Sequence, residues 1–280
     1  MMVSMHSTTP VLTSTSNPRI KAAVALRERR ERDTAGLTIV DGAREIRRAL
    51  DAGVDVTEAY VCGSLVGGAD ARVALDRLTT KRIPITPVSE TVFAKLAFGS
   101  RAEGLVVVAR TPSTALDRLV PGPDPLILVM EGVEKPGNVG AVLRSADGAG
   151  VDAVVAASPV TDLYNPNAIR ASAGTIFAVP LAAAPSAAVL SWLRSIGARI
   201  VTARVDATMT YTDVDLTGAV AIVLGAEADG LTDTWRGEHI TGVRIPMAGT
   251  ADSLNVSISA AILAYEARRQ RDRTKQGAST

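Results

Sequence analysis

The stretch L-I-L-V-M-E-G-V-E-K-P-G-N-V-G-A-V-L-R (126–144) joins an apolar run of strand length to a glycine-containing loop and then to a helix-like segment. Residues 126–130 are all apolar, as expected of a strand buried on both faces. The same order of strand, loop and helix recurs between residues 126 and 269. We therefore predict an α/β domain with a mainly parallel sheet. Ligands of such sheets bind at the carboxyl ends of the strands.

The surrounding sequence predicts two domains joined by a Pro/Gly-rich linker at 113–125. The first domain spans 1–112, with 1–12 as a disordered tail, and the second spans 126–270, followed by a tail at 271–280. In the first domain we predict a helix from Asn17-Pro18, strands at 37–40, 58–61, 83–88 and 105–109, and helices at 44–52 and 71–79. In the second we predict strands at 153–157, 177–181, 199–205, 219–225 and 243–246, and helices at 139–149, 187–195 and 253–269.

Composition excludes several classes of function. Apolar residues make up 47% of the 280 residues and charged residues 21%, which is typical of a globular chain. Aromatic residues make up only 3%, too few for a base-stacking platform. With one Cys, and with His6 and His239 as the two His residues, neither a multi-Cys metal site nor a Ser-His-Asp triad is expected. We expect no bound metal and, with no signal segment or membrane span in the sequence, a cytoplasmic protein.

The net charge of +1 hides an asymmetry. Residues 1–112 hold 16 basic and 12 acidic residues, whereas residues 113–280 hold 14 and 17. Basic residues are densest near the start of the first domain. A solvated helix face and a phosphate-binding surface both explain this cluster. The candidate RNA-binding residues are Arg19, Lys21, Arg27, Arg29, Arg30 and Arg32.

Three strand ends carry unusual loops. The first, at 131–140, leads to Asn138, which fits a helix cap, and to Arg144; it lacks the G-x-G-x-x-G spacing of a dinucleotide site. The second, L-G-A-E-A-D-G-L (224–231), is either a plain glycine turn or a loop that approaches a ligand closely. The third, at 245–255, ends in Ser253 and Asn255, which could cap the last helix or contact a ligand.

Together, in this order, the loops resemble the motifs of the SpoU/TrmH branch of the SPOUT RNA methyltransferases. The segments that carry the resemblance are N-V-G-A-V-L-R (138–144), R-A-S-A-G (170–174), L-G-A-E-A-D-G-L (224–231) and I-P-M-A-G-T-A-D-S-L-N-V-S (245–257). The first domain resembles the small ribosomal-protein-L30e-like α/β domain that often precedes this one. Its weaker match lies in S-N-P-R-I-K (16–21), V-D-G-A-R-E (40–45) and A-E-G-L-V-V-V (102–108).

The resemblance implies methylation of an RNA ribose 2′-hydroxyl by S-adenosylmethionine, a trefoil knot in the second domain and a homodimer. It implies Arg144 as the catalytic arginine, with the polar companions Asn138, Glu227, Ser253 and Asn255. The residues implied to bind the cofactor are Gly225, Ile245, Leu254, Thr202, Ala203 and Met247. Ala226 and Ala228 depart from the Asn and Gly that the second motif usually carries.

A guanidinium with a pKa above about 12 rarely gives up its proton, so we expect Arg144 to bind phosphate and stabilise charge on the 2′ oxygen. Water or the phosphate would then accept the proton. The separate first domain favours 23S ribosomal RNA over tRNA as the substrate. A resistance enzyme of the avilamycin or thiostrepton type, which methylates the large-subunit RNA of its own host, fits this substrate. The alternatives are a tRNA 2′-O-methyltransferase, a catalytically inactive RNA-binding SPOUT protein, a base methyltransferase and a nucleotide-dependent dehydrogenase.

Overall fold

The computed structural model describes residues 10–98, 103–226 and 229–277, and the chain divides into two compact units. The first contains Met1–Pro112 and Tyr164–Arg170, and the second contains Ser113–Leu163 and Ala171–Thr280. The sequence placed residues 164–170 in the second domain, whereas they pack with the first unit. There Thr38 Oγ1 donates to Tyr164 O at 3.0 Å, and Arg170 Nη1 pairs with the buried Asp41 Oδ2 at 3.2 Å.

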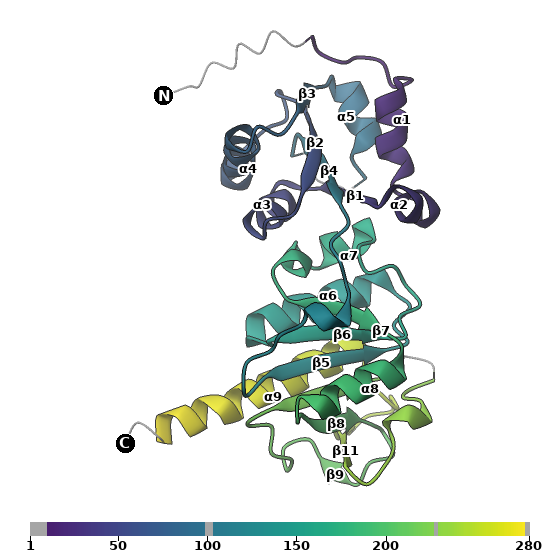
Figure 1. Ribbon diagram of the computed structural model, residues 1–280, viewed down its shortest axis with the longest axis vertical. Coiled ribbons are helices and arrows are strands. Elements are labelled where there is room, and N and C mark those ends of the chain that lie inside the picture. Colours follow the sequence, from purple (N-terminus) through teal and green to yellow (C-terminus); the bar gives the residue numbers. More distant parts are fainter. Residues whose placement is uncertain (1–9, 99–102, 227–228, 278–280) are drawn as a thin grey trace. The chain divides into compact units, whose positions relative to one another are not determined.

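The first unit is built on a four-stranded sheet with the order β1-β4-β2-β3 (Figure 1). Its central strand β4 runs antiparallel to both neighbours, and β2 pairs with β3 in parallel. The strands are β1 (Leu37–Asp41), β2 (Val56–Val61), β3 (Ile85–Pro87) and β4 (Leu105–Arg110). The helices are α1 (Pro18–Ala25), α2 (Arg29–Ala35), α3 (Ala43–Asp51), α4 (Gly68–Thr80) and α5 (Glu90–Leu96).

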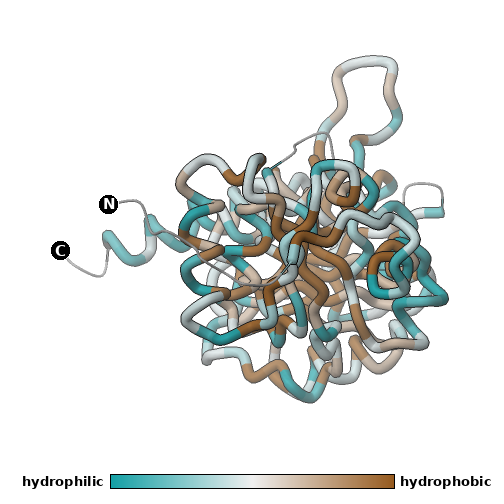
Figure 2. Tube along the Cα trace, turned by 90° about the horizontal axis from the view of Figure 1, so that it is seen from above, coloured by the Kyte–Doolittle hydropathy of each residue, from teal (hydrophilic) through white to brown (hydrophobic). Residues whose placement is uncertain are grey.

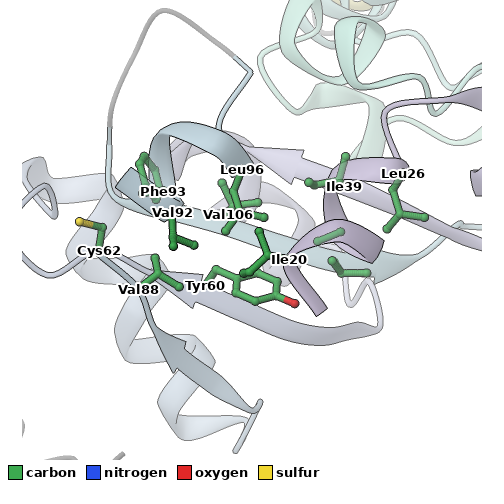
Figure 3. Packing of buried hydrophobic residues seen from close by; sticks show 12 residues of the cluster. Ile20, Leu26, Ile39, Tyr60, Cys62, Val88, Val92, Phe93, Leu96 and Val106 are labelled. Carbon is green, nitrogen blue, oxygen red and sulfur yellow. The ribbon is translucent and has the colours of Figure 1, made fainter. Parts of the chain in front are cut away.

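The core of the first unit forms between the sheet and helices α1 and α5. Ile20 from α1, Tyr60 from β2 and Phe93 from α5 are almost completely buried and belong to one cluster (Figure 3). Asn17 caps α1, since its side chain accepts a hydrogen bond from Arg19 N at 2.9 Å. Helix α5 was not predicted, because its seven residues are too few for a clear helical period.

The disordered tail expected at 1–12 does not extend to Leu12, which is structured. Leu12 forms a β-bridge with Val88, donating through its N–H to Pro87 O at 2.8 Å and accepting from Ser89 N at 3.0 Å. Its apolar side chain also packs against the core of the first unit. Residues 1–9 lie outside the described part of the chain.

The second unit contains the predicted parallel sheet, with seven strands in the order β7-β6-β5-β10-β8-β11-β9. Every neighbouring pair is parallel. The strands are β5 (Leu126–Glu131), β6 (Ala153–Ala157), β7 (Leu181–Ala184), β8 (Arg199–Ala203), β9 (Met209–Thr210), β10 (Val220–Leu224) and β11 (Ile240–Arg244). The strand predicted at 177–181 is wrong. Residues Thr175–Phe177 form a 3₁₀ turn, η2, and β7 begins only at Leu181.

Helices cover both faces of this sheet, as apolar strands without polar alternation require. The helices of this unit are α6 (Pro136–Ala149), α8 (Ser186–Ser195) and α9 (Val256–Gly277), and its remaining turns are η1 (Leu116–Arg118) and η3 (Asp233–Trp235). Helix α7 (Pro166–Ala171) lies mostly in the first unit. Ile127 and Val129 of β5 pack with Val189 and Leu193 of α8. The intervening side chains of β5 point to the opposite face, where α9 packs against α6 and the sheet. In Figure 2 the hydrophobic segments, coloured brown, lie mostly inside the trace, whereas the segment that leads to the C-terminus is largely teal.

Parts of the linker expected at 113–125 and of the C-terminal tail expected at 271–280 are structured. Leu116 and Leu119 pack against the core of the second unit, and Ala183 N donates to Thr114 O at 2.8 Å. Helix α9 does not end near 270 but continues to Gly277. Its Arg271 donates to the carbonyls of Asp124 at 2.8 Å and Leu216 at 3.2 Å, which ties the helix to loops beside the sheet.

Candidate functional site

The unusual loops after β10 and β11 lie close together, beside the loop after β8, because these strands share one edge of a parallel sheet. Strand β10 lies between β5 and β8, and β11 follows β8, so their carboxyl ends share one edge. The loops after β8, β10 and β11 line a cleft of about 500 Å³. The structure places six of the predicted site residues there: Ala203, Gly225, Ile245, Met247, Ser253 and Leu254. Thr202 does not line it; it is buried in β8 and donates to Thr241 O at 3.4 Å.

The loop after β10 folds back on itself at a position that only glycine can occupy. Ala226 and Gly230 exchange two backbone hydrogen bonds of 3.1 Å. A Cβ at Gly225 would lie 2.2 Å from the Gly230 carbonyl carbon, and no side chain tolerates that distance. Gly225 therefore lets two stretches of backbone cross at the edge of the cleft. The predicted Glu227, and Ala228 beside it, lie outside the described residues.

Charged side chains of both signs line the same cleft, and three of them, Arg204, Asp206 and Arg236, were not predicted. Arg204 holds Asp206 with two hydrogen bonds of 2.9 and 3.2 Å, and Arg236 approaches the same carboxylate at 3.5 Å. The hydrogen bonds from Arg204 lower the pKa of Asp206 below its ordinary value. Asp229 and Asp252 also line the cleft. This mixture suits a ligand that carries both positive and negative groups.

A second hollow of about 340 Å³ adjoins the first and shares Gly225, Ala226 and Val256 with it. Glu131 and Asn138 line this hollow. Asn138 is not the helix cap that the sequence suggested, because α6 begins at Pro136 with Lys135 at the cap position.

Asn255 lies immediately before α9 and performs the capping role that the sequence allowed for it. Its Oδ1 accepts from Ser257 N at 2.8 Å and from Ser257 Oγ at 2.6 Å. Its Nδ2 also donates to Asn138 Oδ1 at 3.3 Å. The start of α9 is thereby joined to the first turn of α6, as a site shared by the first and third loops requires.

Arg144 lies on an exposed face of α6 and lines neither cleft. Among the described residues, no ion pair or side-chain hydrogen bond holds its guanidinium. Gly148, one turn further along α6, lies against Tyr265 of α9, since a Cβ there would be 2.7 Å from the Tyr265 Oη. Arg144 therefore lies one turn from the point where α6 meets α9, and its side chain is exposed.

The six candidate RNA-binding cations in the first unit separate into two groups. Arg32 is 3% exposed and donates to the carbonyls of Leu26 and Arg27. Arg27 donates to three carbonyls near the end of α5, and Arg19 pairs with Glu58 at 2.8 Å. The guanidinium groups of Arg27 and Arg32 thus donate to backbone carbonyls and stabilise the fold, whereas the sequence had predicted that they bind RNA. The cations that expose their side chains are Arg19, Lys21, Arg29 and Arg30.

The described residues contain no group of three or more His, Cys, Asp or Glu side chains arranged to hold a metal ion. Within the same part of the chain, no helix combines the length and the hydropathy needed to cross a membrane.

Comparison with known proteins places the two units in known families. The model of the SpoU rRNA methylase family matches residues 125–265, and the model of an MRM3-like substrate-binding domain matches residues 17–107. The chain belongs to the SpoU rRNA methylase family. A 23S rRNA (uridine(2479)-2′-O)-methyltransferase from Streptomyces viridochromogenes is 32% identical over 255 residues, covering 88% of this chain and 87% of the relative. The 23S rRNA (guanosine-2′-O-)-methyltransferase RlmB of Vibrio vulnificus is 32% identical over 82% of this chain and 96% of its own.

Solved structures of SpoU relatives superpose on nearly the whole chain. A crystal structure described as an RNA 2′-O ribose methyltransferase is 44% identical, with a TM-score of 0.82 over 93% of this chain and 99% of its own. The SpoU methyltransferase AviRb from Streptomyces viridochromogenes, in complex with AdoMet, is 30% identical, with a TM-score of 0.81 over 91% of this chain and 98% of its own. The SpoU resemblance seen in the sequence is therefore confirmed.

Proposed function

We propose that this SpoU family member transfers a methyl group from S-adenosylmethionine to a ribose 2′-hydroxyl in RNA, and that the RNA is 23S ribosomal RNA. The observation that best supports this proposal is the cleft lined by the loops after β8, β10 and β11; the last two of these loops carry SpoU-like motifs. Relatives that match most of the chain are named as 23S rRNA 2′-O-methyltransferases, and the AviRb structure contains AdoMet.

The residues of the cleft fit this cofactor. Its volume, about 500 Å³, lies within the range of small-molecule sites. Backbone groups at Gly225, Ile245 and Leu254 can bind the adenosine, and the charged walls suit the ammonium and carboxylate of the methionine part. When bound, the cofactor supplies a methyl group already activated by its positive sulfur. The protein's task is then to position the ribose hydroxyl and stabilise the charge that develops on its oxygen.

Arg144 is the residue we assign to that stabilisation. Its guanidinium stays protonated near neutral pH, so it donates hydrogen bonds to phosphate or to the 2′ oxygen instead of accepting a proton. Asn138, in the first turn of the same helix, lines the hollow beside the cofactor cleft and can contact the ribose. The 2′-hydroxyl proton leaves through water or the RNA phosphate.

A homodimer would bring Arg144 to a cleft, which the single chain does not do. Ile258 and Tyr265 project from α9 with about half of their surface exposed, at 50% and 52%, and lie seven residues apart on one helical face. Tyr265 also borders α6 at Gly148, one turn along the helix from Arg144. We propose that the α6–α9 face pairs with a second copy, and that the chain between β11 and α9 threads the trefoil knot.

The cellular role follows from the substrate. We propose that the protein acts in the cytoplasm, and that methylation of 23S rRNA protects the ribosome from an antibiotic that binds the large subunit. The similarity to the 23S rRNA uridine-2479 methyltransferase supports the large-subunit RNA as the substrate.

The proposed function is tested with purified protein, labelled S-adenosylmethionine and either 23S rRNA or bulk tRNA. Calorimetric binding of the cofactor and transfer of label to 23S rRNA are expected. Binding without transfer to either RNA would leave a non-catalytic RNA-binding protein, and preferential labelling of tRNA would overturn the assigned substrate.

A further inference from the structure

We propose that Glu131 is a positioning residue that holds the loop after β10 in its cofactor-binding shape. The proposal rests on the proposed function, because it assigns S-adenosylmethionine to the cleft. Glu131 does not line that cleft; it borders the adjoining hollow and acts through Thr232, at the far end of the loop.

Glu131 is the last residue of β5 and is 4% exposed. Buried carboxylates usually pair with a cation, yet among the described residues no cation pairs with this one. Three neutral donors satisfy it instead. Oε1 accepts from Ser186 Oγ at 2.6 Å and from Thr232 Oγ1 at 2.8 Å, and Oε2 accepts from Thr232 N at 2.8 Å.

Two of the three hydrogen bonds fix one end of the cofactor loop. The loop leaves β10 at Leu224, lines the cleft with Gly225, Gly230 and Leu231, and reaches Thr232 directly afterwards. The 3.1 Å backbone pair between Ala226 and Gly230 holds its middle. Glu131 anchors its end to the strand next to β10. Without this anchor, Leu231 and the Gly230 backbone must be ordered when the cofactor binds, which weakens affinity.

The carboxylate is needed because all three partners donate. A glutamine side chain has one acceptor oxygen and one donor nitrogen, so its nitrogen would face at least one N–H or O–H group. Glu131→Gln keeps the volume and breaks the arrangement. Thr232→Val removes one donor at an exposed position and leaves the buried carboxylate in place, so folding is not in question for this variant.

Ser186 offers a matched control on the other side of the same carboxylate. It begins α8, and its N–H donates to Ser158 Oγ at 3.0 Å. Neither residue lines the cleft. Ser186→Ala therefore removes a hydrogen bond from Glu131 without loosening the cofactor loop.

The test measures the S-adenosylmethionine Kd by calorimetry, the melting temperature, and the methyl-transfer rate at saturating cofactor. We expect Glu131→Gln and Thr232→Val to raise the Kd about tenfold or more, which corresponds to about 1.4 kcal/mol. Their rate at saturating cofactor should return close to that of the unmodified protein. We expect the double variant to bind the cofactor no more weakly than Glu131→Gln alone, because both substitutions act on the same contact between Glu131 and Thr232. Ser186→Ala should keep the original Kd.

Several results would overturn the proposal. An unchanged Kd in both Glu131→Gln and Thr232→Val would show that the anchor does not govern the cofactor loop. An equal rise in Ser186→Ala would show that the carboxylate acts through general stability. If the unmodified protein itself does not bind S-adenosylmethionine, the proposed function fails first and this inference with it; if it binds and Glu131→Gln binds equally well, only this inference fails.

Discussion

Asn255 donates from its Nδ2 to Asn138 Oδ1 over 3.3 Å, across 117 positions of the sequence. The bond links the cap of α9 to the first turn of α6. Because Asn255 also caps α9 through Ser257, one side chain both starts a helix and orients the amide that borders the hollow beside the cofactor cleft. The capping and ligand-site interpretations of Asn255 are therefore compatible.

Arg144→Ala should remove methyl transfer and preserve cofactor binding. Arg144 is assigned to the phosphate and the 2′ oxygen of the RNA and not to the cofactor, so the S-adenosylmethionine Kd should not change. Loss of a charge-stabilising donor typically lowers kcat by about 10²–10³-fold. Single-turnover methylation and calorimetry measure the two effects. Arg194→Ala on the exposed surface of α8 is the matched control and should behave like the original protein. Normal turnover in Arg144→Ala would remove Arg144 from the mechanism.

Gly225→Ala should abolish cofactor binding, because its Cβ would lie 2.2 Å from the Gly230 carbonyl carbon. The loop must open to relieve this contact, and we expect the S-adenosylmethionine Kd to rise by more than about tenfold. Gly137→Ala is the control. Nothing lies within 4 Å of a Cβ there, and alanine should stabilise α6 by about 0.5–1 kcal/mol. A Gly225→Ala protein that binds the cofactor normally would contradict the crossing described for this loop.

The exposed cations of the first unit and those that stabilise the fold should respond differently to substitution. Replacing Lys21, Arg29 and Arg30 with alanine should weaken RNA binding and reduce its salt dependence by about 0.7–0.9 per lost phosphate contact. Arg27→Ala should instead lower the melting temperature, since it leaves three carbonyls near the end of α5 without their donor. Filter binding at several salt concentrations measures the first effect. An unchanged salt dependence in the triple variant would exclude this face as an RNA surface.

Glu45 in α3 should make the first unit more sensitive to pH. It is 7% exposed, and its burial, with a smaller contribution from Glu103, raises its pKa above the ordinary 4.5. The folded state therefore binds this proton more tightly than the unfolded state, and the group destabilises the fold at neutral pH. The penalty disappears as the pH falls through the raised pKa towards 4.5. We expect Glu45→Gln to raise the melting temperature at pH 7, with an advantage that shrinks on acidification. The exposed Glu31→Gln should show no advantage, and a constant or growing advantage for Glu45→Gln would refute the assignment.

Much of the fold could be predicted from the sequence because the strands of the second unit are continuous apolar runs. Strand β6 begins and ends where its residues predict, since no polar alternation or glycine blurs its limits. Strand β7 was misplaced because Phe177–Leu181 is equally apolar, and the 3₁₀ turn at Thr175–Phe177 depends on contacts around Ser172 distant from any strand pattern. The short helix α7 carries too few residues for its period to show.

The loops that line the site could be predicted from the sequence, but the side-chain hydrogen bonds that hold the structure around them could not. The strand ends predicted where a ligand would bind, and the resemblance to the SpoU motifs implied Gly225, Ile245 and Leu254 as cofactor-binding residues. Arg27 and Arg32 show the opposite case, because sequence cannot tell a cation on the surface from one that satisfies buried carbonyls. Glu131 was overlooked for a related reason: a single acid at the end of an apolar strand has no signal until its donors from β7–α8 and the cofactor loop converge on it.

The most direct test of the central claim is the chemical identity of the methylated product. The protein is incubated with unmodified 23S rRNA and S-adenosylmethionine, and the RNA is digested to nucleosides for mass spectrometry. We predict one 2′-O-methylated nucleoside, with the added mass on the ribose fragment, and its absence with Arg144→Ala. Methyl groups on a base, or no modified nucleoside at all, would contradict the assignment as a ribose 2′-O-methyltransferase.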